Sequence, residues 1–170
     1  MKKLNPIVLS LLSMALISTV SIAAPERTRL ETVAERGADV MPFDLKATTH
    51  IFTKTESGGV QKVIAKNANN AQQISLIREH LKEIAGQFLK GDFSAPAHIH
   101  DTDMPGLAKL KEAKPSEIKV QYGKIKAGAQ IVYATKNPEL VAALHQWFDA
   151  QLADHGSDAM EGHDNAKMHH

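Results

Sequence analysis

The chain has 170 residues, a formal net charge of +1 at pH 7 and 43% hydrophobic residues. It contains no cysteine, which excludes thiolate metal sites, iron–sulfur clusters, covalently attached c-type haem and thiol catalysis. A charge this close to zero gives no general attraction to nucleic acid, so we expect no nucleic-acid partner.

Residues 1–23 are expected to be an export signal. Lys2 and Lys3 supply the basic start, residues 7–20 are apolar, and Ser21-Ile22-Ala23 fits the small-x-small cleavage rule. Cleavage there removes two lysines and no acid, so the formal charge goes from +1 to −1. The apolar run is too short for a membrane span, so we expect a periplasmic or secreted protein without stable membrane association after cleavage.

The next segment, residues 24–45, is predicted to hold an N-terminal helix over residues 27–36 and a linker. Residues 46–54 then alternate with the period of a strand, and residues 60–66 form a second β-rich run after a glycine-containing turn. Together these two runs predict a β-hairpin.

An amphipathic helix follows the hairpin, with apolar residues at helical spacing: Ile74, Ile77, Leu81, Ile84 and Phe88. After a short helix at residues 107–113, strands are predicted at residues 118–122 and 129–135, and Asn137-Pro138 starts a final helix. The chain therefore contains two successive ββα units.

The predicted fold class is α+β, with duplicated ββα units forming one antiparallel four-stranded sheet and the helices packed on one face. This domain spans residues 46–156. Gly59–Ala65 aligns with Gly128–Ala134 at a constant offset, which suggests an internal duplication. Residues 157–170 are predicted to be a flexible tail containing histidine and methionine.

Between the two units, Ala97–Gly106 carries several potential metal ligands. His98 and His100 are two residues apart, so in an extended segment both rings point the same way. Imidazole suits copper, zinc and nickel, and a thioether such as Met104 shifts the preference toward copper, especially Cu(I). The alternative is a solvated loop.

The most informative single residue is His50, which shares a strand face with Phe52 and aligns with Val120 of the second unit. A polar ring at a core-facing position needs a partner, which is either a hydrogen-bonding group of the core or a metal ion. His145 on the last helix is a further candidate ligand, oriented by Asp149, or else an ordinary helix-surface residue.

Two more histidines are interpreted without a metal. His80 is expected on a helix surface, beside Glu79 and Glu83. His155 follows Asp154 at a helix end, where an imidazolium ion interacts favourably with the helix dipole.

Five stretches resemble a family of small bacterial proteins that are sometimes labelled aspartate carbamoyltransferase: Met41-Pro42-Phe43-Asp44-Leu45, Thr48–Phe52, Gly91-Asp92-Phe93, His100 with Met104-Pro105-Gly106-Leu107, and Ala143–Gln151. A carbamoyltransferase is expected to be a much longer chain, with two α/β domains and a Ser-Thr-Arg-Thr-type loop that this sequence lacks. The resemblance therefore implies a shared fold without an activity. It covers His50, His100, Met104 and His145.

The leading functional hypothesis is a non-enzymatic, exported metal-binding protein that handles or buffers copper. Its candidate ligands are His50, His100, Met104, His145 and His98. One alternative is non-covalent haem binding through a histidine or His/Met axial pair. Another is a metal-free binding or structural module. The motifs of serine hydrolases, zinc proteases and phosphate-binding loops do not occur in the sequence, which argues against those enzyme classes.

Overall fold

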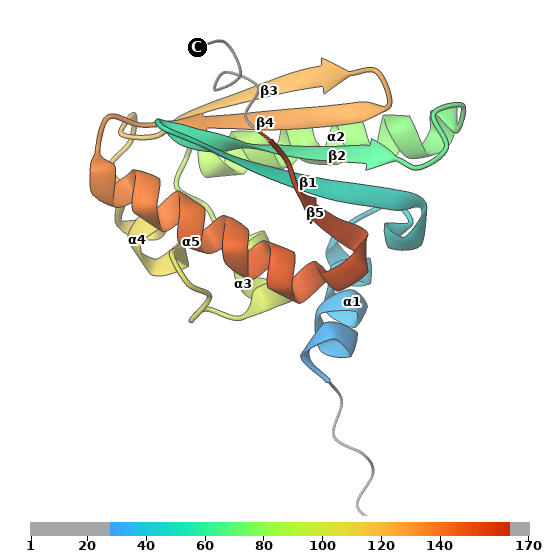
Figure 1. Cartoon of the computed structure of the whole chain (residues 1–170), viewed down its shortest axis with the longest axis horizontal. Helices are drawn as coiled ribbons and strands as arrows, with labels where there is room; N and C mark the ends of the chain where they lie inside the picture. Colours follow the sequence, from blue (N-terminus) through green and yellow to red (C-terminus); the bar gives the residue numbers. More distant parts are fainter. Residues whose placement is uncertain (1–27, 164–170) are drawn as a thin grey trace, which may run out of the picture.

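The structure, a computed structural model, describes residues 28–163 (Figure 1). Its helices are α1 (Arg29–Val40), α2 (Ala71–Phe88), α3 (Ser94–His100), α4 (Leu107–Glu112) and α5 (Pro138–His155), with 3-10 turns at Leu45–Ala47 and Gly156–Asp158. Its strands are β1 (Thr48–Thr55), β2 (Gly58–Ala65), β3 (Lys119–Ile125), β4 (Gly128–Ala134) and β5 (Ala159–Glu161).

The predicted α+β class is confirmed, with one mixed five-stranded sheet of order β3-β4-β2-β1-β5. The first four strands are antiparallel to their neighbours, whereas β5 pairs in parallel with β1 through the register His50↔Ala159 to Phe52↔Glu161. Helices α2 and α5 pack on the same face of the sheet (Figure 1).

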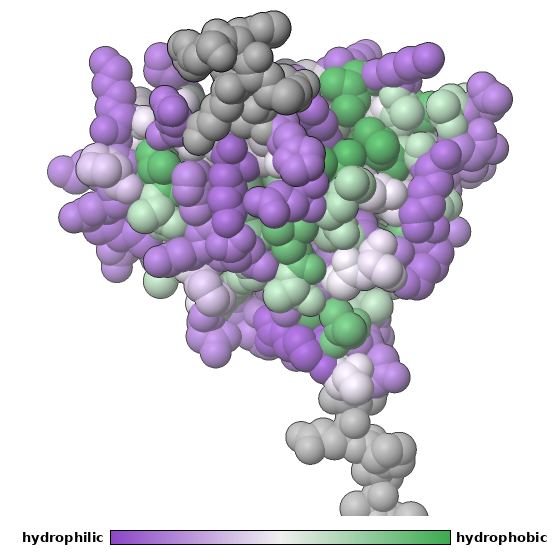
Figure 2. Space-filling view, in the orientation of Figure 1, coloured by the Kyte–Doolittle hydropathy of each residue, from purple (hydrophilic) through white to green (hydrophobic). Residues whose placement is uncertain are grey.

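The core lies between that face and the helices. Four aromatic side chains surround the buried ring of Trp147 on α5, with ring centroids 5.7–6.4 Å away: Phe88, Phe93, Tyr133 and Phe148. Burial of such aromatic side chains is a main source of stability in a chain without disulfides. The face seen in Figure 2 is largely hydrophilic, with hydrophobic side chains in separated patches.

Both long helices begin at an asparagine cap, as their sequences indicate. The Asn70 side chain accepts a hydrogen bond from the backbone N–H of Gln73, and the Asn137 side chain accepts one from Glu139. Pro138 occupies the first turn of α5, where its missing N–H costs nothing. These caps fix where α5 starts, and therefore which of its residues reach the sheet.

The two ββα units are present, but the sequence alignment between them does not match the faces of the sheet. Val63 of β2 pairs with Ala129 and is buried on the helix-covered face. Val132, its counterpart in the alignment, pairs with Val60 in the alternate position and so lies on the opposite face. The two units therefore share a topology, but residues aligned at that offset do not occupy equivalent positions in the sheet.

Two segments differ from the sequence prediction. Residues 159–161, assigned to a flexible tail, form β5, because their backbone adds to the free edge of β1. The junction, expected to be extended up to His100, is helical over Ser94–His100, with the Asp92 side chain accepting a hydrogen bond from the backbone N–H of Ser94.

Some expectations concern residues outside the described part of the chain. The export signal at residues 1–23 and the end of the tail at residues 164–170 both lie there. Among residues 28–163, no helix combines the length and the hydrophobicity needed to cross a membrane.

Candidate functional site

Three histidines from distant parts of the sequence meet at one end of the sheet, two of them buried and the third, His155, half-buried. His50 is in β1, His100 is the last residue of α3, and His155 is the last residue of α5. The rings of His50 and His155 stack with centroids 4.7 Å apart and planes inclined by 20°, and the His100 ring meets His155 edge-on at 5.1 Å. We call these three residues the histidine cluster.

His100 is held in one orientation by a carboxylate. Its Nδ1 lies 2.8 Å from Oδ2 of Asp154, and Arg29 donates to both oxygens of that carboxylate, at 2.9 and 2.7 Å. Burial acts to raise the pKa of the Asp154 carboxyl, but its hydrogen bonds to Arg29 and His100 outweigh burial and lower the pKa. An ionised carboxylate only accepts, so Nδ1 of His100 carries the proton.

Burial keeps His100 neutral in spite of this partner. It lowers the pKa of the imidazole, and the opposing effect of Asp154 does not fully restore the pKa. With the proton on Nδ1, the lone pair of the ring is on Nε2. A carboxylate that fixes a histidine tautomer in this way is typical of the surroundings of metal ligands.

The other two rings are also held neutral by burial. Burial lowers the pKa of His155 to about 4, and it holds the pKa of His50 well below the ordinary value. His155 Nε2 donates to Oε1 of Gln151 at 3.1 Å, which leaves the lone pair on Nδ1. His50 Nε2 has no hydrogen-bond partner among the described residues, although the side chain is only 4% exposed.

The histidine cluster lines a small pocket of about 50 Å³, called here the inner cavity. Its wall also includes Met41 and Trp147, and the buried Nε1 of Trp147 has no partner among residues 28–163. A cavity of this volume has room for a few water molecules or for an ion with its ligands.

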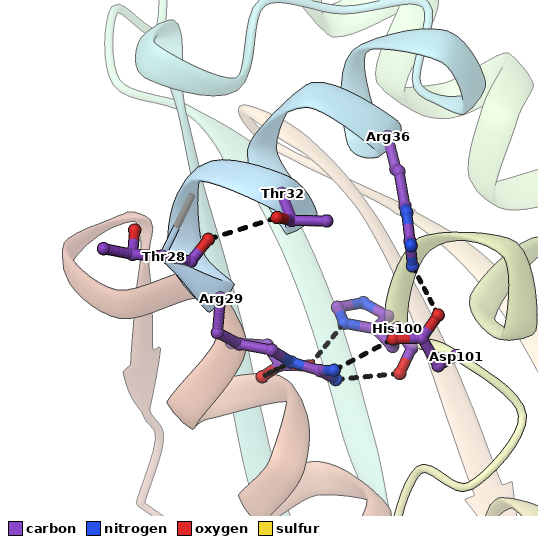
Figure 3. Close-up of polar contacts among 7 residues, drawn as sticks. Thr28, Arg29, Thr32, Arg36, His100 and Asp101 are labelled. Atoms are coloured by element: carbon purple, nitrogen blue, oxygen red, sulfur yellow. Dashed lines mark hydrogen bonds and ion pairs between the residues drawn. The ribbon is translucent and has the colours of Figure 1, made fainter. Parts of the chain in front are cut away.

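Helix α1 covers this end of the molecule and is fastened to the cluster by charges (Figure 3). Arg29 donates to the backbone carbonyl of His100 at 2.8 Å and to Asp101 at 3.0 Å, and Arg36 also pairs with Asp101. Asp101 has a φ of 69°, which is uncommon for a non-glycine residue. The two arginines therefore hold the backbone just after His100 in a sparsely populated conformation.

Of the five residues proposed as ligands from the sequence, only His50 and His100 lie together. His98 is exposed, because α3 is a helix and two residues along a helix turn the side chain to another side. Met104 is 3% exposed within the hydrophobic core and is not part of the cavity wall.

His145 also lies away from the cluster. Its Nε2 is within 3.0 Å of the carbonyl oxygen of Thr55 and 2.9 Å of that of Gly58, so this nitrogen carries a proton and donates to both. The imidazole thereby binds α5 to the turn between β1 and β2. Asp149, expected to orient His145, instead pairs with Lys54.

Three members of the site were not recognised in the sequence. His155 and Met41 line the inner cavity, as does His80, whose ring makes an edge contact with Phe43 at 5.6 Å. Spacing alone gives no signal for His155, since its neighbours come from β1 and α3. For Met41, the break in periodicity at Pro42 indicated a return toward the core.

No set of three or more His, Asp or Glu side chains within residues 28–163 already has an arrangement that would hold a metal ion. Comparison of the chain with protein-family models, with curated proteins and with solved structures finds no match. The side chains of the histidine cluster are therefore the main evidence for function.

Proposed function

We propose that the protein is an exported copper-binding protein whose site is the inner cavity, with His50, His100 and His155 as ligands. One observation carries this proposal: three neutral imidazoles, two buried and one half-buried, share the wall of one small cavity. Neutral imidazole is the form that binds a metal, and a buried neutral ring needs no deprotonation at neutral pH.

The hydrogen bonds of the cluster support the same proposal. Asp154 holds the Nδ1 proton of His100 and Gln151 holds the Nε2 proton of His155, so each ring keeps one lone pair free of these bonds. The Nε2 atom of His50, which has no partner in the described part of the chain, is costly in a metal-free core, where buried polar atoms are normally paired. Coordination of a metal would remove that cost.

Copper is favoured over other metals by the sulfur in the cavity wall. Met41 supplies a thioether beside the imidazoles, and this combination of soft and borderline ligands suits copper. Because His50 and His155 stack almost parallel, at least one ring must rotate before both lone pairs meet at one ion. A porphyrin is much larger than the inner cavity, so the volume favours an ion over non-covalent haem.

The proposal is tested with the single tryptophan of the chain. Trp147 lines the inner cavity, so Cu(II) bound there should quench its fluorescence. We expect saturable quenching by one equivalent of Cu(II), which is lost in a His50→Ala/His100→Ala double variant. Circular dichroism of both proteins checks that the fold is retained.

Histidines outside the cluster supply the control. His98 and His163 are exposed, and a His98→Ala/His163→Ala variant should quench like the parent protein. Full quenching in the cluster variant, or loss of quenching in the control variant, would place the copper elsewhere and overturn the proposed site.

A further inference from the structure

A second and larger hollow lies outside the histidine cluster. It has a volume of about 410 Å³ and runs between α1, the 3-10 turn at residues 45–47 and the end of α5. We call it the outer groove. Its α1 wall is made of small and aliphatic side chains: Leu30, Val33, Ala34 and Ala38.

The outer groove ends at two imidazoles of the cluster. His50 and His155 line both the groove and the inner cavity, together with Met41 and Phe43. These four side chains therefore separate the two hollows. A molecule in the groove would have its inner end against the imidazoles and its body against the aliphatic wall of α1.

The mouth of the groove is open to solvent and partly apolar. Leu30 is 50% exposed, and hydrophobic atoms reach the surface at the end of the molecule where α1 lies (Figure 2). A volume of 300–1,000 Å³ with mainly apolar walls and a few converging polar groups is usual for small-molecule sites, so the groove is of suitable size.

The charged side chains of the groove already have partners. Lys46 binds Asp158 at 2.5 Å, and Asp154 is bound by Arg29. The Asp44 side chain accepts hydrogen bonds from two backbone N–H groups. An ionised ligand would have to break one of these pairs or enter without a counter-charge, which is costly in a partly buried site. An uncharged ligand has neither cost.

One buried polar atom defines the inner end of the ligand. The Nε2 atom of His50 has no hydrogen-bond partner within residues 28–163 and belongs to a side chain that is 4% exposed. A hydroxyl group both donates and accepts, so it satisfies this nitrogen in either tautomer of the ring. The nearby Phe43 ring, 6.1 Å from that of His50, offers an aromatic surface to the adjoining part of the ligand.

From these features we infer that the outer groove binds a small, uncharged organic molecule with an aromatic body and a hydroxyl group directed at His50. This site adjoins the copper site, since His50 and His155 line both hollows, and it is defined for the metal-free protein. The chemical class it defines is that of the phenols and aromatic alcohols.

The inference is tested on the metal-free protein with two probes of equal shape, 4-methylphenol and p-xylene, by NMR titration. If the hydroxyl hydrogen bond contributes about 1 kcal/mol, 4-methylphenol should bind roughly fivefold more tightly, although p-xylene is the more hydrophobic molecule. Equal or tighter binding of p-xylene, or no saturable binding of 4-methylphenol at millimolar concentration, would overturn the inference. Tighter binding of 4-methylbenzoate would also overturn it, since the ligand would then be an anion.

A groove-filling variant locates the site. Ala38 is exposed and lines the outer groove, so Ala38→Phe should abolish binding of 4-methylphenol without disturbing the core. Ala108→Phe, at an exposed position on α4, is the matched control and should bind the probe normally. Binding that survives in Ala38→Phe would contradict the assignment to this groove.

The two proposals fail separately. Ala38 is not part of the inner-cavity wall, so copper quenching of Trp147 should persist in Ala38→Phe. Loss of phenol binding with retained copper binding in that variant supports both sites. A parent protein that binds copper but not 4-methylphenol would refute the groove inference alone.

Discussion

At the scale of single residues, Asp154 determines how His100 can act. Its carboxylate holds the Nδ1 proton of His100 and is itself bound by Arg29 through both oxygens. Partners of this kind commonly change metal affinity by about 10- to 100-fold when they are removed. The same carboxylate therefore links the N-terminal helix to the proposed copper site.

We expect Asp154→Asn to weaken copper binding by roughly 10- to 100-fold while the protein remains folded. The amide cannot reproduce both the acceptor for His100 and the charge that binds Arg29. Competition with a chelator of known affinity measures the change. Asp149→Asn, on the exposed side of the same helix, should leave the affinity unchanged; an equal loss in both variants would mean that Asp154 has no specific role.

His145 has the opposite character, because it stabilises the fold and lies outside the cluster. Truncation to alanine removes the donor for the carbonyls of Thr55 and Gly58, which should cost about 1–3 kcal/mol of unfolding free energy. Urea unfolding measures the loss. Copper quenching of Trp147 should be unchanged, and weaker copper binding would restore His145 as a candidate ligand.

At the scale of elements, α1 acts as a cover held by ion pairs. Arg29 and Arg36 reach Asp101, whose backbone directly follows His100 (Figure 3). Arg29 also reaches Asp154. Ion pairs at partly exposed positions contribute little each and are screened by salt. Local unfolding of α1 should therefore require less free energy than unfolding of the core.

Hydrogen exchange tests this expectation. Arg36→Gln should increase amide exchange in α1 severalfold, with little change in α2, because one of the two arginines that hold Asp101 is lost. Added salt should also increase amide exchange in α1 of the parent protein. Unchanged protection of α1 in the variant would show that apolar contacts alone hold this helix.

The elements also show which parts of the fold were predictable from the sequence. Apolar periodicity located α2 and α5, and alternation located the hairpins, because each pattern is local. Helix α3 was missed because it has only seven residues, and Pro96 and two histidines within it obscure the apolar periodicity of a helix. Strand β5 was missed because its three residues have no pattern of their own and are ordered by pairing with β1.

The site was predictable only in part for the same reason. His50 was recognised because a histidine at a core-facing strand position conflicts with its surroundings. The sequence around His155 and Arg29 does not mark either residue as unusual, since their roles depend on contacts between residues far apart in the chain. Met104 was expected to join His100 in one site, but it is buried in the hydrophobic core and does not line the inner cavity.

At the scale of the whole molecule, the buried histidines make stability depend on pH. Burial lowers the pKa of His155 to about 4 from an ordinary value of 6.5. Below pH 6.5 the unfolded chain therefore binds a proton that the folded chain does not, so stability is complete above pH 6.5 and falls as the pH drops toward 4. His50 and His100, with lowered pKa values, act in the same direction.

For the metal-free protein we expect the unfolding free energy to fall by on the order of 2 kcal/mol from His155 alone between pH 6.5 and pH 4. Urea unfolding at several pH values measures this. A His155→Asn variant should lose part of this pH dependence below pH 6.5. Above pH 7, the slope of its unfolding free energy against pH should equal that of the parent protein. An identical pH profile in both proteins would show that His155 is not buried as a neutral ring.

X-ray absorption spectroscopy of the copper-loaded protein tests whether His50, His100 and His155 bind one copper ion together. We expect outer-shell scattering from three imidazoles, with one imidazole lost in His155→Ala and the spectrum unchanged in His98→Ala. A spectrum that His155→Ala leaves unaltered, or a protein that retains no copper, would contradict this prediction.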